Sequence, residues 1–283
     1  MVLINDIFFD KVEVPGIFDD LINSAWVKRL GRIHQSGAIF LVNPNICHTR
    51  LEHSIGVMLL IRHLGGSELE QVAGLLHDIS HTAFSHVGDY VFDNIEENYH
   101  EQVFEDILRS SDIPEILSWH GYDIDQVING TFNILEQAIP KLCADRLDYT
   151  LRDSYHAGLV SRKEVKDFIK HLSVEDGIIV IEKEEKAEWI NNLYKKLIND
   201  VFNLPLHIYA NRKLTELIKF GLQRNELVHG DLLKDDTYLL NKIRSTTFGY
   251  EGVKAIKQQK GFDMFVKKGM GLKMKNRQLN ALI

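Results

Sequence analysis

The stretch AGLLHDISHTAFSH, residues 73–86, places three histidines and an aspartate in an otherwise apolar segment. Leu76 and Ile79 have the spacing of the buried side of a helix, and His77 and Asp78 interrupt that side. Polar groups in such a setting cost free energy unless a partner satisfies them. The chain must therefore fold so that other segments bring partners to this helix.

Helix-start signals on both sides of this stretch indicate a helical fold. The sequences TRLE at 49–52, SELE at 67–70 and NYHE at 98–101 have the capping-box pattern, in which glutamate follows the capping residue by three positions. The first predicts a helix that ends at the glycine pair 65–66. The second predicts a helix that carries His77 and Asp78 and runs as far as Ile79.

Apolar periodicity and turn residues place the remaining elements. A strand or hairpin is expected over 2–15 and an edge strand over 177–185. The predicted class is mostly α with a minor β element. Further helices are expected over 18–33, 141–158, 186–202 and 207–223.

Length and composition are those of a globular protein. The 283 residues are 45% hydrophobic and 26% charged, and the formal net charge of −7 argues against a broad surface for duplex nucleic acid. We expect a core over 1–215 and a C-terminal extension over 216–283 packed on it.

The cellular setting is predicted from the cysteines and the apolar segments. Cys47 and Cys143 make no disulfide framework, which favours a reducing compartment. Neither a signal peptide nor a membrane-spanning stretch is expected, so the predicted location is the cytoplasm.

The pair His77-Asp78 has two interpretations. It is either a surface pair, with the histidine satisfied by a backbone carbonyl, or part of a metal site, since imidazole and carboxylate suit iron, manganese, nickel or zinc. Two ligands are too few for tight binding, so other helices must supply more. His53 and Asp145 lie on neighbouring predicted helices and would aim inward between them.

Three further histidines and an arginine admit a similar choice. His81, His86 and His100 are either core histidines with local hydrogen bonds or contacts to an anionic substrate. Arg50 either pairs with Glu52 or binds phosphate oxygens with its planar fork. On the 141–158 helix, polar residues gather on one face, which any amphipathic helix would also show.

The ordered motifs HTRLEHS, LLHDISHTAFSH, YHEQ and ADRLDYTLRD resemble those of the HD-domain phosphohydrolase superfamily. Within it, the chain is similar to the deoxynucleoside triphosphate triphosphohydrolases, which include bacterial dGTPase-like enzymes and mammalian SAM-and-HD-domain enzymes. The resemblance covers residues 1–215 and implies the helical HD-domain fold.

The resemblance implies a metal centre with His53, His77, Asp78 and Asp145 as ligands. It implies one divalent transition-metal ion, which would be Fe, Mn, Ni, Co or Zn, and an additional Mg²⁺ with the nucleotide. In the family, water activated by the metal attacks the α-phosphorus and releases a deoxynucleoside and tripolyphosphate.

The resemblance also implies a nucleotide pocket around that centre. Three histidines would lie beside the triphosphate and act in catalysis. The other residues would bind the phosphates or the sugar. Arg50 would bind a phosphate oxygen, Tyr149 would lie under the sugar 2′ position, and Gln35 and Asp153 would contact the 3′-hydroxyl. The catalytic histidines are His81, His86 and His100.

The pocket departs from the family pattern at three positions. Cys143 stands where the family usually has an aspartate, Arg146 replaces a substrate-binding lysine, and Ser36 replaces a leucine that packs on the sugar. The predicted function is metal-dependent hydrolysis of nucleotides, with dNTPs as substrates and a homo-oligomeric assembly. The alternatives are a nucleoside monophosphate phosphatase, a cyclic-nucleotide phosphodiesterase and a non-catalytic nucleotide sensor.

Overall fold

Helices form most of the structure, and several begin at the capping residues that the sequence provides. The computed structural model describes residues 1–269. At the start of α3 (Arg50–His63), Thr49 accepts from the amide of Glu52, and the Glu52 carboxylate accepts from the amide of Thr49. This capping box confirms the predicted helix start.

Within the described residues, the β structure consists of two antiparallel hairpins, which confirms the mostly α class. In the first hairpin Val2 pairs with Val14, and in the second Leu172 pairs with Ile181. The strands are β1 (Val2–Asp6), β2 (Asp10–Val14), β3 (Leu172–Glu175) and β4 (Ile178–Ile181).

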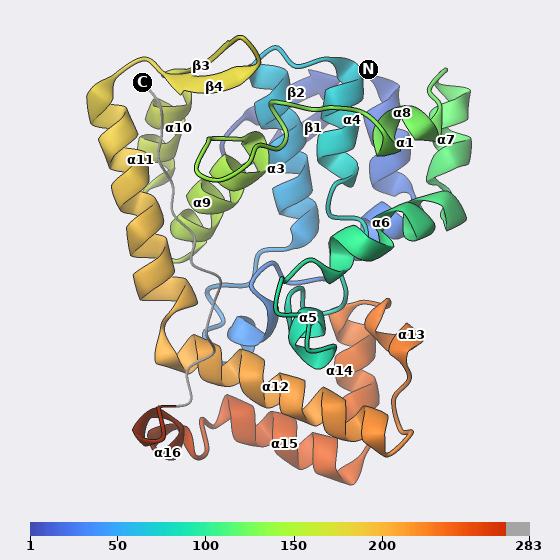
Figure 1. Ribbon diagram of the computed structural model, residues 1–283, viewed down its shortest axis with the longest axis vertical. Helices are drawn as coiled ribbons and strands as arrows, with labels where there is room; N and C mark the ends of the chain where they lie inside the picture. The colour runs from blue at the N-terminus through green and yellow to red at the C-terminus, as the bar shows by residue number, and fades with distance from the viewer. Residues whose placement is uncertain (270–283) are drawn as a thin grey trace.

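Figure 1 shows the helices in their order along the chain. Besides α3, they are α1 (Gly16–Asn23), α2 (Ala25–Leu30), the 3₁₀ helix η1 (Gly37–Leu41), α4 (Glu68–Leu76), α5 (Val87–Val91), α6 (Tyr99–Ser110), α7 (Ile113–Trp119), α8 (Ile124–Ile128), α9 (Ala144–His156), α10 (Arg162–Ile169), α11 (Glu184–Leu197), the π-helical turn η2 (Ile198–Phe202), α12 (Pro205–Gln223), α13 (His229–Leu232), α14 (Asp236–Arg244), α15 (Thr247–Lys257) and α16 (Phe262–Lys267).

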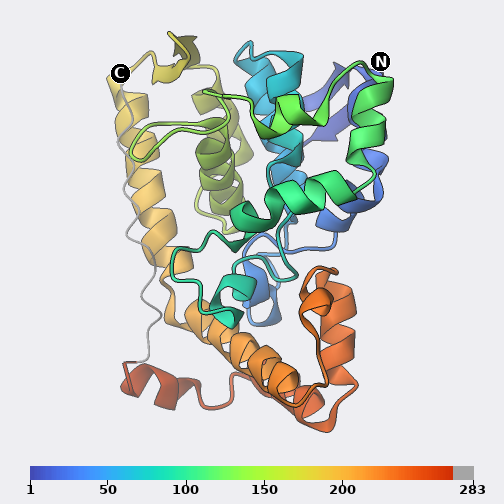
Figure 2. The same ribbon diagram turned by 45° about the vertical axis from the view of Figure 1, so that its right-hand side comes forward.

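Two large apolar clusters hold these helices together. The larger one gathers α1, α3, α4, α9 and α11 with both hairpins, and it occupies the upper part of Figure 1. The second joins α12, α14 and α15 to η1 and α5 in the lower part, and Figure 2 shows α12 crossing beneath the upper helices. The functional residues predicted from the sequence come from the junction of these two parts.

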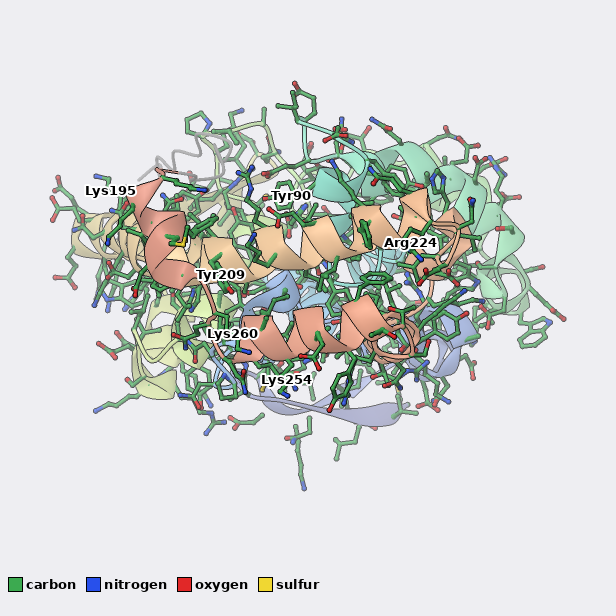
Figure 3. All side chains as sticks on the ribbon, turned by 90° about the horizontal axis from the view of Figure 1, so that it is seen from below. Tyr90, Lys195, Tyr209, Arg224, Lys254 and Lys260 are labelled. Carbon is green, nitrogen blue, oxygen red and sulfur yellow. The ribbon has the colours of Figure 1, made fainter. Side chains whose placement is uncertain are left out.

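The lower helices are tied to one another through α12. Figure 3 shows α12 and α15 side by side, with Tyr209 near Lys260. The Tyr209 hydroxyl donates to the backbone carbonyl of Lys260 at 2.7 Å, and its ring packs against Phe262 and Phe265. This contact fixes the segment that leads into α16.

Three helix predictions need correction. The helix expected over 18–33 is two helices, because Ser24 has extended backbone and caps α2 by accepting from the amide of Val27. The helix expected to reach Ile79 ends at Leu76. At 98–101 a helix does start, but Asn98 makes no capping hydrogen bond, so the predicted capping box is wrong there.

The predicted domain boundary at residue 215 lies inside α12. Ala210, Leu214 and Ile218, on both sides of it, belong to one apolar cluster. Residues 270–283 of the predicted extension lie outside the described residues. Over residues 1–269, every helix is too short or too polar to cross a lipid bilayer.

Candidate metal centre and nucleotide pocket

A cavity of about 700 Å³ is lined by residues of both apolar clusters. Its volume lies in the range of small-molecule sites. Eleven of the twelve predicted site residues line it, and His53, which is 1% exposed, lies behind its wall. The eleven are Gln35, Arg50, His77, Asp78, His81, His86, His100, Asp145, Arg146, Tyr149 and Asp153.

The His77-Asp78 pair lies in the turn that follows α4. The Nδ1 of His77 donates to the backbone carbonyl of Gly74 at 2.8 Å. This bond is the one expected of a histidine satisfied by the backbone, yet it uses only one ring nitrogen. The buried Nε2 of His77 has no hydrogen-bond partner in residues 1–269. Its lone pair is therefore available to a ligand.

The four predicted metal ligands converge on one volume. Nε2 of His53 lies 3.1 Å from a carboxylate oxygen of Asp145 and 3.8 Å from one of Asp78. Nε2 of His77 lies 3.4 Å from Asp78 and 3.6 Å from Asp145. Ligand atoms of His53, His77 and Asp78 all fall within 4.8 Å of one another. The resemblance grouped these residues, and the fold brings them together.

A buried network holds His53 from behind. Its Nδ1 donates to Asp148 at 2.9 Å, and Asp148 accepts two hydrogen bonds from Arg152, each of 2.9 Å. Arg152 also pairs with Asp6 of β1 at 3.0 Å. A carboxylate behind a ligating histidine fixes its tautomer and makes it a better ligand.

Gly56 lets this network pass against α3. A Cβ atom there would lie 2.0 Å from Arg152 Nη2 and 2.1 Å from Asp148 Oδ1. Only glycine fits at this point of the helix.

The electrostatics of the centre are those of a cation site. Burial lowers the pKa of His53, but hydrogen bonds with Asp145 and Asp148 outweigh it and raise the pKa to about 10. Burial likewise opposes a raised pKa at His77, where the charge of Asp78 prevails. Asp78, Asp145 and Asp148 keep pKa values below the usual range of an aspartate, although burial acts to raise them. The carboxylates therefore stay ionised and attract positive charge.

The imidazoles of His53 and His77 and the carboxylates of Asp78 and Asp145 form a donor set that fits a divalent transition metal, and Fe, Mn, Ni, Co and Zn are all suitable. The unpartnered Nε2 of His77 is one of the donors.

Arg50 borders the same centre. Its Nη1 donates to Asp78 at 2.5 Å and its Nε donates to the Ser85 hydroxyl at 2.7 Å. The alternative of a pair with Glu52 is wrong, since Glu52 serves the cap of α3. Arg50 is thus a buried cation on the cavity wall, held beside a candidate ligand.

The three remaining histidines form a cluster next to Asp78. The rings of His81 and His100 stack with centroids 3.9 Å apart, and His86 meets both edge-on. Burial and the charge of Arg50 hold the pKa of His81 well below its usual value. Burial and the charge of His86 lower the pKa of His100 to about 3. Both are therefore neutral near pH 7 and present N–H donors.

His86 is supported by Asp89, a carboxylate that is not among the predicted metal ligands. Its Nδ1 lies 3.0 Å from Asp89, which also accepts from the amide of Tyr99. Asp89 keeps a lowered pKa, since these hydrogen bonds outweigh its burial. An ionised carboxylate behind His86 accepts from its Nδ1 and orients the ring.

The segment 34–36 forms another wall of the cavity. It is docked onto the residues before α3 by an antiparallel bridge between His34 and Thr49 and by a bond from the Gln35 amide to the His48 carbonyl. Within residues 1–269, the side-chain oxygens of Gln35 and Ser36 are buried without a hydrogen-bond partner.

Gly37 turns the chain after Ser36. Its φ is +68°, and a Cβ there would meet Asn211 Oδ1 at 2.7 Å and the Phe84 carbonyl at 2.9 Å. The turn is therefore closely packed, and it holds Ser36 in place.

Asp153 of α9 reaches the cavity beside this wall. Its Oδ1 lies 2.6 Å from Nε2 of His48, which is fully buried. His48 in turn stacks on His156, with ring centroids 4.4 Å apart. The predicted sugar contact is therefore a positioned carboxylate.

The other predicted pocket residues have local partners. The hydroxyl of Tyr149 lies 3.4 Å from that of Tyr194. Arg146 donates to the carbonyls of Gln137 and Lys141, and so holds the loop that forms part of the cavity wall. Cys143 is buried, and burial raises the pKa of its thiol to about 11.

Three residues of the site were not predicted from the sequence. Asp148, Asp89 and His48 each support a predicted residue through one hydrogen bond. Asp148 follows Asp145 by three positions, and Asp89 follows His86 by three positions. This spacing is the sequence signal from which the two aspartates could have been found. His48 has no such signal, because its partner lies 105 residues away.

Comparisons with known proteins identify the family. The HD domain family matches residues 50–153. The uncharacterized protein YdhJ of Bacillus subtilis is 42% identical over 280 residues, which cover 95% of this chain and 86% of that protein. The metal-dependent phosphohydrolase cns2 of Cordyceps militaris is 34% identical over 234 residues, 78% of this chain and 67% of that protein.

A more distant relative carries a more specific name. The deoxynucleoside triphosphate triphosphohydrolase SAMHD1 homolog of Dictyostelium discoideum is 29% identical over 254 residues, which cover 74% of this chain and 46% of that protein. The region that the HD domain family matches, residues 50–153, contains all four predicted metal ligands. The chain belongs to the HD-domain family of metal-dependent phosphohydrolases, as its motifs predicted.

Proposed function

We propose that this chain hydrolyses nucleotides in the cavity, and that dNTPs are cut to a deoxynucleoside and tripolyphosphate. The observation that carries the proposal is the meeting of three features in one cavity of about 700 Å³. These features are a donor set for a metal, a group of phosphate-binding side chains and a wall of hydroxyl-binding oxygens. The relative from Dictyostelium, named as a dNTP triphosphohydrolase, supports this substrate class.

In this proposal His53, His77, Asp78 and Asp145 hold one divalent transition metal. When bound, the metal supplies an activated water and stabilises negative charge on phosphoryl oxygens. Asp148 keeps the proton of His53 on Nδ1, so that Nε2 faces the centre.

The phosphates would lie beside Arg50, His81 and His100. Arg50 supplies positive charge, and the two neutral histidines supply N–H donors without a like-charge conflict. This set exceeds what a single phosphate group requires, which favours a polyphosphate over the monophosphate of the alternative functions.

His86 would provide the proton for the leaving group. The Pα–O bond to the sugar breaks, and the 5′-oxygen leaves as a hydroxyl after it takes a proton. Asp89 accepts from Nδ1 of His86 and so holds the ring in one orientation. A positioned general acid of this kind contributes roughly 10²- to 10⁴-fold to rate.

The products of the reaction test this function. Incubation of the metal-loaded protein with a panel of dNTPs should release tripolyphosphate and deoxynucleoside in equal amounts from the first turnover, as read by ion-exchange chromatography. Orthophosphate or pyrophosphate as the initial product would instead indicate the monophosphatase or another nucleotide hydrolase. A protein that binds nucleotides without turnover would indicate the sensor.

Tyr149 provides a test of sugar selection. Its ring lies one helical turn from Asp145 on the cavity wall. A rigid ring there would crowd a ribose 2′-hydroxyl, and such a fit discriminates by roughly 10- to 200-fold. Tyr149→Ala should therefore narrow the difference in kcat/KM between dATP and ATP. Equal slowing of both substrates would make Tyr149 a packing residue, and Tyr149→Phe, which keeps the ring, is the control.

A further inference from the structure

We propose that Ser36 is a specificity-determining residue whose hydroxyl binds the 2′-hydroxyl of a ribose, so that this pocket accepts ribonucleotides as well as deoxynucleotides. The inference rests on the proposed function, which places a nucleotide sugar against the wall formed by Gln35, Ser36 and Asp153.

The wall offers more acceptors than a deoxyribose can use. The side-chain carbonyl of Gln35 and the hydroxyl of Ser36 are both buried without a partner in the part of the chain that the structure describes. Asp153 adds a carboxylate, of which one oxygen is taken by His48. A buried polar atom left without a hydrogen bond is costly, so a matching ligand brings O–H groups to these positions.

The three residues form one rigid surface. The Gln35 amide donates to the His48 carbonyl at 3.0 Å, and the His48 ring holds Asp153 at 2.6 Å. The backbone bond thus joins the 34–36 segment to the residue that orients Asp153. The turn at Gly37 fixes Ser36 from the other side.

The number of hydroxyls decides between the two sugars. A 3′-hydroxyl has one proton, so it can satisfy one of the acceptors that Gln35, Ser36 and Asp153 offer. A ribose brings a second proton to the same wall, on the neighbouring 2′-hydroxyl, and the proposal assigns this proton to the Ser36 oxygen, which lines the cavity beside Gln35 without a partner within residues 1–269. This contact offsets the crowding from Tyr149, and the two residues act in opposite directions on sugar selection.

Binding of nucleosides tests the inference separately from turnover. Dissociation constants are measured by calorimetry on the full chain for adenosine, 2′-deoxyadenosine and 3′-deoxyadenosine, and for the guanosine series. In Ser36→Ala, the affinity for the ribonucleoside relative to the 2′-deoxynucleoside should fall by about tenfold, the effect of one lost hydrogen bond to a buried group. The ratio between the ribonucleoside and the 3′-deoxynucleoside should not change.

Ser154→Ala is the matched control. Ser154 is buried, and its hydroxyl also has no partner within residues 1–269, but it does not line the cavity. Its substitution should leave all ratios unchanged.

The inference is overturned if Ser36→Ala changes the ratio of ribonucleoside to 2′-deoxynucleoside affinity no more than it changes the ratio of ribonucleoside to 3′-deoxynucleoside affinity. This is the result expected if bound water, and not the sugar, satisfies the serine. It is also overturned if the shift falls on the 3′-hydroxyl, or if no nucleoside binds the wild type. A wild type that binds with the expected ratios but releases no tripolyphosphate would contradict the proposed function alone.

Discussion

Asp78→Ala should leave the protein with little metal and reduce nucleotide hydrolysis by roughly a thousandfold or more. Asp78 touches both histidines of the candidate centre, at 3.4 Å from His77 and 3.8 Å from His53. A bound cation stabilises the transition state by several kcal/mol, and each 1.36 kcal/mol is a factor of about ten in rate. Elemental analysis of the purified variant, with activity measured on the same sample, checks both parts.

The control must separate loss of metal from loss of fold. Asp78→Ala also leaves Arg50 buried without its ion pair, which lowers stability. His77→Ala removes a ligand without stranding that charge, and it should lose metal as well. Asp231→Ala is the control. It removes another buried aspartate, which pairs with Lys242 away from the cavity, and this variant should keep its metal. Undiminished metal in both cavity variants would remove these residues from the centre.

The structure around Asp78 shows where local sequence patterns stop being sufficient. The apolar spacing predicted a helix to Ile79, but α4 ends at Leu76. Beyond it, the carbonyls of Ile79 and His81 accept from the buried guanidinium of Arg29, at 2.7 and 2.8 Å. Arg29 lies 50 residues before Ile79, so no sequence window around the motif contains this interaction.

The three capping patterns differ in outcome because other donors compete for their side-chain oxygens. TRLE forms both bonds of its box. In SELE, Ser67 does cap the helix, but Glu70 accepts instead from the amides of Ile134 and Leu135 at 2.7 and 3.2 Å. In NYHE, the oxygen of Asn98 is taken by Asn94 and Gln102.

For the site, motif order was sufficient to predict which residues meet but not what supports them. His53 and Asp145 are 92 residues apart and still lie 3.1 Å from each other. Asp148 and His48 were missed because their importance depends on which ring nitrogen or carboxylate oxygen they contact. That information exists only once α3, α9 and the segment before α3 are packed together.

Arg152→Met should destabilise the metal-free protein by about 3–5 kcal/mol, the typical cost when one partner is removed from a buried ion pair. Arg152 is 1% exposed and is the cation shared by Asp148 and Asp6. Without it, Asp6 loses its buried cation, and Asp148 keeps only the hydrogen bond from His53. Urea unfolding followed by circular dichroism measures the change.

Arg162→Met is the matched control, since Arg162 also binds the first hairpin, through Asp10 and the carbonyl of Ile7. Its side chain is 45% exposed, so water can replace the lost contacts and the effect should be much smaller. If the two variants had the same free energy of unfolding, Arg152 would not be the cation that compensates the buried carboxylates.

Adding Asp6→Asn and Asp148→Asn to Arg152→Met removes the stranded charges and should recover part of the lost stability, because neutral groups are cheaper to bury. Metal affinity should not recover with it, since the side-chain amide that Asp148→Asn introduces is a weaker acceptor for the Nδ1 proton of His53 than a carboxylate. Recovery of stability without recovery of metal binding would separate the two roles of this network.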